Sequence, residues 1–154
     1  MAARSVVVFL DARLEAIEED GALVRISRAP DTARPSLAGP LGTALQQQLL
    51  EFAEGKRTSF DLPYRLEAEG MAQEVYRGIS RIGYGETVSY SDLARMAGYP
   101  AAIRRVATLC GRNPLPLLIP CHRVIRKDGH AGGYNLGTGF KERLLLLERE
   151  NNER

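Results

Sequence analysis

Two short helical patterns joined by a glycine turn constrain the fold of this chain more than any other feature of its sequence. Residues 91–97 form the first pattern, with Ser91 as the expected N-cap and Asp92 in the first helical turn. The tripeptide Gly98-Tyr99-Pro100 ends that helix, and residues 101–111 form a second helix that carries arginines. This succession is typical of a helix-turn-helix motif, which presents its second helix to DNA.

The segments around this motif are predicted to be mainly helical. Residues 71–82 place apolar side chains at helical spacing and stop at Gly83, and residues 140–150 form the last helix. Between them, residues 123–126 are expected to form a short strand, and residues 127–139 a glycine-rich connection.

The first part of the chain is predicted to be a small unit of strands and one helix. A β-branched run at 5–10 precedes two alternating segments, 13–18 and 22–27, which flank Asp20-Gly21, a strong hairpin signal. A proline-rich loop covers residues 29–40, a helix covers 43–54 and residues 58–65 are expected to be extended. We therefore expect an α+β protein. A small N-terminal α/β domain with an antiparallel hairpin, residues 1–66, precedes a mainly helical, winged-helix-like domain with the helix-turn-helix, residues 67–154. The N-terminal domain is assigned a scaffolding role.

Composition excludes several classes of protein. No apolar run approaches the ~20 residues that a membrane-spanning helix needs, and residues 1–10 lack the cleavage pattern of a signal peptide. The two cysteines, Cys110 and Cys121, are too few for a secreted disulfide scaffold. These features indicate a cytoplasmic protein without membrane association.

Charge is distributed unevenly along the chain. Residues 1–69 carry 8 basic and 11 acidic side chains, a net charge of −3, whereas residues 70–130 carry 9 basic and 4 acidic side chains, a net charge of +5. A positive segment beside a negative one indicates a surface for a polyanion on the second part. Arginines that merely solvate helices would give the same count, so charge supports the DNA interpretation without deciding it.

The segment Pro120-Cys121-His122-Arg123-Val124 is the strongest candidate for chemistry. A thiol has a pKa of about 8.5 and is mostly protonated at neutral pH, and a neighbouring imidazole is a usual device for ionising it. Adjacent residues of a strand point to opposite faces, so Cys121 and His122 require a turn, the start of a helix or a bridging water to act together. The alternative is that Cys121 is a small buried hydrophobic residue.

Three motifs in the order and spacing of a known family surround this segment. The sequence resembles the O6-alkylguanine-DNA alkyltransferases (methylated-DNA–protein-cysteine methyltransferases) from about Gly70 to Glu150. The motifs are Gly85-Glu86-Thr87-Val88-Ser89-Tyr90, the run from Arg112 to Val124, and Lys141-Glu142 followed by Leu144-Leu145 and Glu148. The resemblance implies direct DNA repair: Cys121 takes the alkyl group from O6-alkylguanine irreversibly and once per molecule, with O4-alkylthymine as a second candidate substrate.

The resemblance also implies roles for the residues around the nucleophile. His122 would be the general base, acting through a water, and Glu148 would orient its imidazole, as in a catalytic triad. Tyr90 would donate from its phenol to the departing base and pack on the flipped nucleotide, and so belong to the DNA-binding residues as well, and Asn113 would be a hydrogen-bonded hinge. The base would be bound by the carbonyl of Val124 and by the backbone of Tyr134 and Asn135, where many members carry serine in place of Asn135.

For the DNA itself, the resemblance implies a helix docked in the minor groove. Arg104 would fill the gap left by the flipped nucleotide, because attack on the O6 alkyl carbon cannot proceed inside the base stack. Ala102 would allow close approach of the helix, and Arg112 and Lys127 would contact phosphates. The expected partner is double-stranded DNA with alkylated bases, bound by a monomer without any cofactor.

Other interpretations remain open at this stage. Some relatives hold a structural zinc in the N-terminal domain, but this chain has no cysteine or histidine before Cys110, and we expect no metal site. Cys110 itself is interpreted as a packing residue. A non-enzymatic sensor of alkyl lesions, a winged-helix regulator of transcription and, more remotely, a thiol hydrolase are the alternative functions.

Overall fold

The computed structural model describes residues 2–153, which form two compact units. The first unit runs to Leu66 and the second begins at Glu67. Within the described residues, no helix combines the length and the apolar character needed to cross a bilayer.

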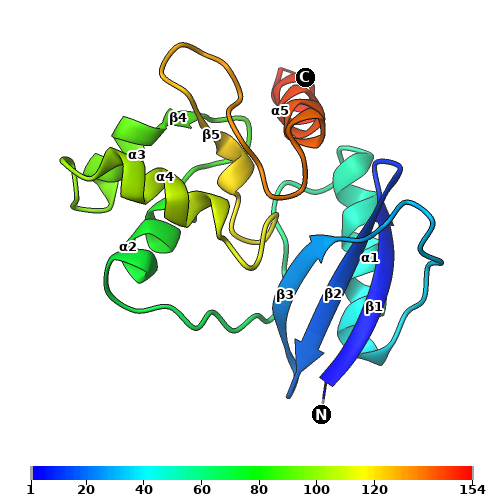
Figure 1. Ribbon diagram of the computed structural model, residues 1–154. Helices are drawn as coiled ribbons and strands as arrows, with labels where there is room; N and C mark the ends of the chain where they lie inside the picture. Colours follow the sequence, from blue (N-terminus) through cyan, green and yellow to red (C-terminus); the bar gives the residue numbers. More distant parts are fainter. Residues whose placement is uncertain (1, 154) are drawn as a thin grey trace. The chain divides into compact units, whose positions relative to one another are not determined.

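The first unit is a three-stranded antiparallel sheet with one helix. Strands β1 (Ala2–Phe9), β2 (Ala12–Glu19) and β3 (Ala22–Arg28) pair in sequence order, and helix α1 (Gly39–Ala53) packs against β1 and β2 (Figure 1). The hairpin expected at Asp20-Gly21 is confirmed, with both residues at positive φ, as a two-residue turn requires. Leu10 and Asp11, also at positive φ, form a second such turn that the sequence analysis did not predict.

Helix α1 begins four residues earlier than expected. Pro40 suits the first turn of a helix, because its fixed φ is helical and its missing N–H needs no partner there. The buried carboxylate of Glu18 accepts from the amide of Leu41 at 3.2 Å and so caps the helix from strand β2. The sequence interval 29–40 is therefore a loop only up to Ala38, and this part of the prediction was wrong.

The predicted extended segment 58–65 ends beside strand β3. The amide of Leu23 donates to the carbonyl of Pro63 at 3.0 Å, and the amide of Arg65 donates to the carbonyl of Leu23 at 2.9 Å. Inside the unit, Phe52 of α1 stacks on Phe60 with ring centroids 5.1 Å apart.

The second unit is mainly helical, as predicted. Helices α2 (Gly70–Ile79), α3 (Tyr90–Met96) and α4 (Ile103–Gly111) pack on one another, and α3 and α4 form the helix-turn-helix (Figure 1). Strands β4 (Val88–Ser89) and β5 (Val124–Ile125) make a short parallel pair. The 3₁₀ turn η1 (Cys121–Arg123) precedes β5, and α5 (Thr138–Asn152) packs on that turn. The last helix is thus two residues longer at each end than the predicted 140–150.

Helix α3 has a different N-cap from the one expected. Ser89, and not Ser91, accepts from the amide of Asp92 at 3.0 Å, and Asp92 accepts in return from the amide of Ser89 at 3.3 Å. This reciprocal capping box moves the start of the helix to Tyr90. At the other end, the amides of Gly98 and Tyr99 donate to the carbonyls of Arg95 and Ala94 and so close the helix. Gly98 has a φ of +88°, which glycine adopts without strain.

Candidate active site

Cys121 occupies the first position of the 3₁₀ turn η1. Its amide donates to the carbonyl of Ile119 at 2.7 Å across Pro120, which folds the chain back sharply at this point. The expectation that Cys121 lies at a turn or helical start is confirmed. The residue is only 2% exposed, so its thiol lies inside the unit and not on its surface.

Asn113 holds the segment that leads to Cys121. Its amide group donates to the carbonyl of Ile119 at 2.7 Å, and its Oδ1 accepts from the amide of Leu115 at 2.9 Å. The side chain is buried, so these two bonds form where water cannot replace them. Between them, Leu117 adopts a positive φ of +80°, a strained conformation for a branched residue that this bonded loop maintains.

His122 and Glu148 form a buried hydrogen-bonded pair. Nε2 of His122 lies 2.5 Å from Oε2 of Glu148, and both side chains are at most 2% exposed. Because the carboxylate accepts, Nε2 carries the proton and Nδ1 is left as an acceptor. Burial lowers the pKa of His122 although Glu148 opposes this, so the imidazole is neutral at rest. Among the described residues, Nδ1 has no hydrogen-bond partner. It is the atom available to receive a proton.

Arg123 is a member of this site to which the sequence analysis gave no role. Its Nε donates to Oε1 of Glu148 at 2.9 Å, its Nη2 donates to Oε2 at 3.1 Å, and its Nη1 donates to the carbonyl of Ile82 at 2.8 Å. The amide of Gly85 also donates to Glu148, at 3.1 Å. Burial alone would raise the pKa of Glu148, but His122 and Arg123 hold that pKa at about 2. The carboxylate is therefore ionised and fixed from several directions.

Lys141 also points inward and was not assigned a role. It is fully buried on α5, and its Nζ donates to the carbonyl of Val124 at 2.6 Å, to the carbonyl of Gly133 at 3.2 Å and to the hydroxyl of Tyr90 at 3.5 Å. Burial raises the pKa of Tyr90 to about 12, so its phenol keeps its proton and is able to donate. The signal in the sequence was the spacing: Lys141 precedes Glu148 by seven residues, two helical turns, and thus shares its face of α5.

The second cysteine lies next to the first. Cys110 of α4 is buried, with its Sγ 4.0 Å from the carbonyl O of Cys121. The pKa of the Cys121 thiol is lowered overall, and hydrogen bonding from Cys110 is the largest cause. Burial raises this pKa, whereas Asn113 and Lys141 lower it further. The pKa of Cys110 moves upward, because its thiol is the donor and because it is buried. The interpretation of Cys110 as a packing residue thus omitted its contact with Cys121.

Comparison with known proteins places this arrangement in a family. The family model for the DNA-binding domain of 6-O-methylguanine DNA methyltransferase matches residues 70–151. A methylated-DNA–protein-cysteine methyltransferase of Mycolicibacterium paratuberculosis is 36% identical over 137 residues, which are 86% of this chain and 83% of that protein. The chain belongs to the 6-O-methylguanine DNA methyltransferase family.

Longer relatives contain the same region. The bifunctional transcriptional activator and DNA repair enzyme Ada of Escherichia coli is 44% identical over 97 residues, which are 63% of this chain. The matching region is only 27% of the length of that protein. For the regulatory protein Ada of Salmonella typhimurium, it is 38% of the length.

Solved structures agree with the fold over almost the whole chain. The O6-methylguanine methyltransferase of Mycobacterium tuberculosis has a TM-score of 0.87 at 28% identity, with 98% of this chain and 94% of that chain covered. The same protein in complex with DNA has a TM-score of 0.83 at 29% identity, with 97% and 93% covered.

Each residue expected to bind the base contacts one of the site residues described above. Tyr134 packs edge to face on His122, with ring centroids 6.4 Å apart, and its buried hydroxyl has no hydrogen-bond partner among the described residues. Asn135 is exposed, and its side chain donates to the backbone carbonyl of Asn113 at 2.9 Å. The side chain of Asn135 therefore ties its loop to the backbone of Asn113. The carbonyl of Val124 is already an acceptor for Lys141.

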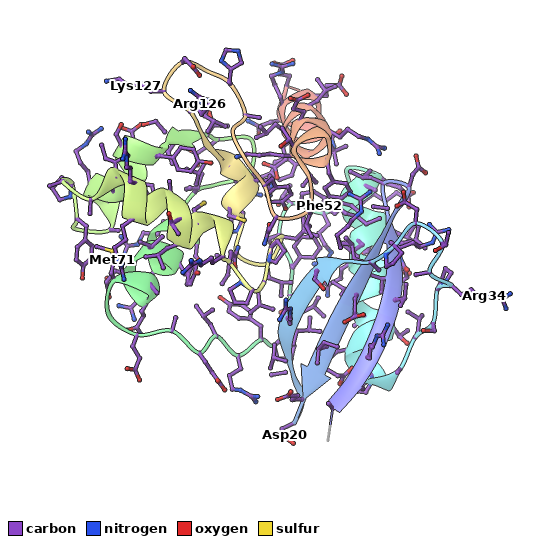
Figure 2. All side chains as sticks on the ribbon, in the orientation of Figure 1. Asp20, Arg34, Phe52, Met71, Arg126 and Lys127 are labelled. Atoms are coloured by element: carbon purple, nitrogen blue, oxygen red, sulfur yellow. The ribbon has the colours of Figure 1, made fainter. Side chains whose placement is uncertain are left out.

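Of the residues expected to bind DNA, Tyr90 contacts the buried Lys141, whereas the others lie apart from the buried side chains described above. Arg104 on α4, Arg112 at its C-cap and Lys127 are all exposed, while Ala102 is the half-buried N-cap of α4. Figure 2 shows the side chain of Lys127 projecting from the loop that follows β5. Within residues 2–153, no group of three histidine, cysteine, aspartate or glutamate side chains is arranged to hold a metal ion.

Proposed function

We propose that this chain repairs DNA by moving the alkyl group of O6-alkylguanine onto Sγ of Cys121. The observation that carries the proposal is the buried Cys121 directly before His122 in the turn η1, with His122 paired to Glu148, in a unit built on a helix-turn-helix. A sulfur–carbon bond forms, the carbon–O6 bond breaks and its electron pair remains on guanine. The thioether has no route back to a thiol, so each molecule reacts once.

Activation of the thiol follows from the charges around it. Cys121 loses its proton to Nδ1 of neutral His122, directly or through a water, and ionised Glu148 stabilises the resulting imidazolium. Arg123 keeps Glu148 ionised and in place throughout. Hydrogen bonding from Cys110 lowers the pKa of the Cys121 thiol, burial opposes this, and Asn113 and Lys141 lower that pKa further, which favours the thiolate.

Departure of the base is assisted by Tyr90. Its high pKa keeps the phenol protonated, and a hydrogen bond from it compensates the negative charge that develops on guanine as the carbon–O6 bond breaks. The backbone of Tyr134 and Asn135 and the carbonyl of Val124 bind the guanine edge in this proposal.

Access to the thiol requires that the base leave the duplex. A guanine inside the stack cannot reach a sulfur that is 2% exposed. Flipping the nucleotide costs a few kcal/mol, and the guanidinium of Arg104, exposed on α4, is the group proposed to replace it in the stack. Arg112 and Lys127 would contact phosphates. Double-stranded DNA with alkylated guanine, or with alkylated thymine as a second candidate, is thus the proposed partner of a cytoplasmic monomer that needs no cofactor. In this proposal the first unit serves as a scaffold.

The test is a titration of the protein with duplex containing one O6-methylguanine, followed by intact mass spectrometry. The proposal expects the mass to rise by one methyl group per protein and to stop there, and expects no change with undamaged duplex. Cys121→Ala should abolish transfer while DNA binding persists. Tight lesion binding without transfer would indicate a sensor instead, and product release beyond one equivalent would indicate a hydrolase.

A further inference from the structure

Cys110 and Cys121 are the only two cysteines of the sequence, and they lie beside each other inside the second unit. Both are free thiols, and both side chains are buried. Sγ of Cys110 in α4 lies 4.0 Å from the carbonyl oxygen of Cys121 in η1. Because the chain has no third thiol, each of these cysteines has only the other as a disulfide partner within the chain.

The loop between the two cysteines is tied together by Asn113. The backbone amide of Asn113 donates to the carbonyl of Cys110 at 3.3 Å. The carbonyl of Ile119 accepts from the side chain of Asn113 at 2.7 Å and from the amide of Cys121 at 2.7 Å. The end of α4 and the turn η1 are therefore joined through one buried residue. A disulfide can form only where the backbone brings two cysteines close together, and this loop does so.

The surroundings give the two thiols different reactivities. Hydrogen bonding from Cys110 is the largest cause that lowers the pKa of the Cys121 thiol, whereas hydrogen bonding and burial raise the pKa of Cys110. Since the thiolate is the form that attacks a peroxide, Cys121 is the cysteine that is oxidised first. Cys110 remains a neutral thiol beside it. A cysteine of low pKa next to a second thiol is the arrangement found in redox-sensing proteins.

We propose that Cys110 is a resolving cysteine, which converts oxidised Cys121 into a reversible disulfide. The oxidant is a small hydroperoxide such as hydrogen peroxide. Sγ of Cys121 attacks one peroxide oxygen, the O–O bond breaks, and water leaves with the thiol proton, so that Cys121 becomes a sulfenic acid. Sγ of Cys110 then attacks the sulfenic sulfur, an S–S bond forms, the S–O bond breaks, and a second water leaves with the proton of Cys110. Two thiols are oxidised and one hydrogen peroxide is reduced to two waters.

The consequences for repair rest on the proposed function. The disulfide removes the thiolate that would accept the alkyl group, so transfer stops. It also spares Cys121 from further oxidation to sulfinic acid, which thiol reductants do not reverse. The burial of Cys121 does not exclude the oxidant, because the proposed function requires an opening wide enough for a base and hydrogen peroxide is far smaller. A dithiol reductant restores both thiols and, with them, the acceptor.

Oxidation of the wild-type protein with excess hydrogen peroxide tests the disulfide directly. Remaining thiols are blocked with iodoacetamide, and the protein is digested with trypsin without reductant. Arg105, Arg112 and Arg123 divide the two cysteines between peptides 106–112 and 113–123. Neither peptide contains methionine, so oxidation of methionine does not alter their masses. We expect the two peptides to be linked, with a mass two hydrogen atoms below their sum, and the undigested protein to remain a monomer on a non-reducing gel.

Methyl transfer from duplex containing O6-methylguanine is the second readout. Transfer by the oxidised wild type should fall in proportion to the linked peptides, and dithiothreitol should restore it fully. Cys110→Ser is the matched variant without the resolving thiol. In it, excess peroxide should carry Cys121 to sulfinic acid, and dithiothreitol should not restore transfer. If thermal unfolding shows that serine is not tolerated at this buried position, Cys110→Ala replaces it.

The inference is wrong if the oxidised wild type contains no link between peptides 106–112 and 113–123, or if that link joins two molecules. It is also wrong if the variant recovers transfer with dithiothreitol as completely as the wild type. Failure of the proposed function is distinguishable, because the reduced wild type would then acquire no methyl group, while the peptide map would still show whether the disulfide forms.

Discussion

Arg123 donates to both carboxylate oxygens of Glu148, from Nε at 2.9 Å and from Nη2 at 3.1 Å. The guanidinium thus binds the same group that orients His122, and it lies one residue beyond the imidazole in the chain. The planar guanidinium group can donate two parallel hydrogen bonds to one carboxylate, which no other cationic side chain can do. Glu148 is therefore held whether or not His122 is protonated, and the imidazole is free to change its charge during the reaction.

Removing this fork should destabilise the second unit. Arg123→Met leaves a buried carboxylate without its charged partner, and we expect a loss of ~3–5 kcal/mol in the free energy of unfolding. Arg81→Met, which removes an exposed arginine of the same unit, should cost less than ~0.5 kcal/mol. Urea denaturation measures both. Equal losses would show that the contacts of Arg123 are not responsible.

The ionisation of Glu148 predicts a dependence of stability on pH. Its pKa is about 2 in the folded protein, lowered from 4.5. Its contribution is therefore present above pH 4.5 and is lost as pH falls towards 2. A shift of this size corresponds to roughly 3 kcal/mol. The pKa of His122 is also lowered in the folded protein, so the unfolded chain binds a proton at a higher pH than the folded protein does. The free energy of unfolding therefore decreases further as pH falls below about 6.5.

Glu148→Gln separates these two contributions. The variant should lose the decline of stability between about pH 4.5 and pH 2, since glutamine does not titrate. Denaturation midpoints collected across this range make the comparison. A variant whose stability still falls as steeply as that of the wild type would show that another group is responsible.

Cys110 should set the pH at which Cys121 reacts. Its Sγ lies 4.0 Å from the carbonyl oxygen of Cys121, and hydrogen bonding from Cys110 lowers the pKa of the Cys121 thiol. In Cys110→Ala this pKa should rise, so the acid limb of the pH profile for methyl transfer should move to higher pH. Cys110→Ser retains a donor and should move the limb less. A limb that stays in place, or moves to lower pH, would contradict the role of Cys110.

The two serines around the start of α3 offer a matched test of the capping box. Ser89→Ala removes the acceptor for the amide of Asp92 and should cost about 1 kcal/mol of stability. Ser91→Ala removes only a hydroxyl contact to Ser89 and should cost a few tenths of a kcal/mol, within the ~0.5 kcal/mol of an ordinary surface change. Thermal unfolding of the two variants decides between the two candidate caps. The reverse order would restore Ser91 as the cap.

Arg104 and Arg105 are adjacent and both exposed, and they provide a matched test of base flipping. Residues next to each other on a helix differ by ~100° in direction, so only one can enter the stack. Arg104→Ala should slow methyl transfer from duplex by roughly tenfold to a hundredfold, the equivalent of the few kcal/mol that flipping costs. Arg105→Ala should slow it much less. Similar losses for both, with weaker binding of any duplex, would indicate phosphate contacts alone.

Much of the fold could be predicted because local rules agree with it. The hairpin at Asp20-Gly21, the glycine that ends α3 and the helical turn at Cys121 all follow from short sequence signals. The turn at Leu10-Asp11 could not be predicted, because Leu10 is not a residue that favours a positive φ and the pairing of β1 with β2 maintains it. The start of α1 was missed because its cap, Glu18, lies on a distant strand.

The contacts of the candidate site were predictable for residues to which a motif assigns a role, and not for residues whose partners lie in other segments. Cys121, His122, Glu148 and Asn113 were found by their positions in the motifs. Arg123 and Lys141 belong to the same motifs, but their roles depend on acceptors contributed by other segments: Glu148 and Ile82 for the first, and Val124 and Gly133 for the second. Cys110 was interpreted as a packing residue because a separation of eleven residues in the sequence does not indicate how close it lies to Cys121 in space.

The identity of the alkylated atom tests the central claim most directly. The protein is mixed with duplex whose O6-methylguanine carries a deuterated methyl group, then digested, and the peptides that contain Cys121 and Cys110 are analysed by mass spectrometry. The proposed function predicts one labelled methyl group on Sγ of Cys121 and none on Cys110. A labelled Cys110, or an unlabelled protein after prolonged incubation with excess duplex, would contradict it.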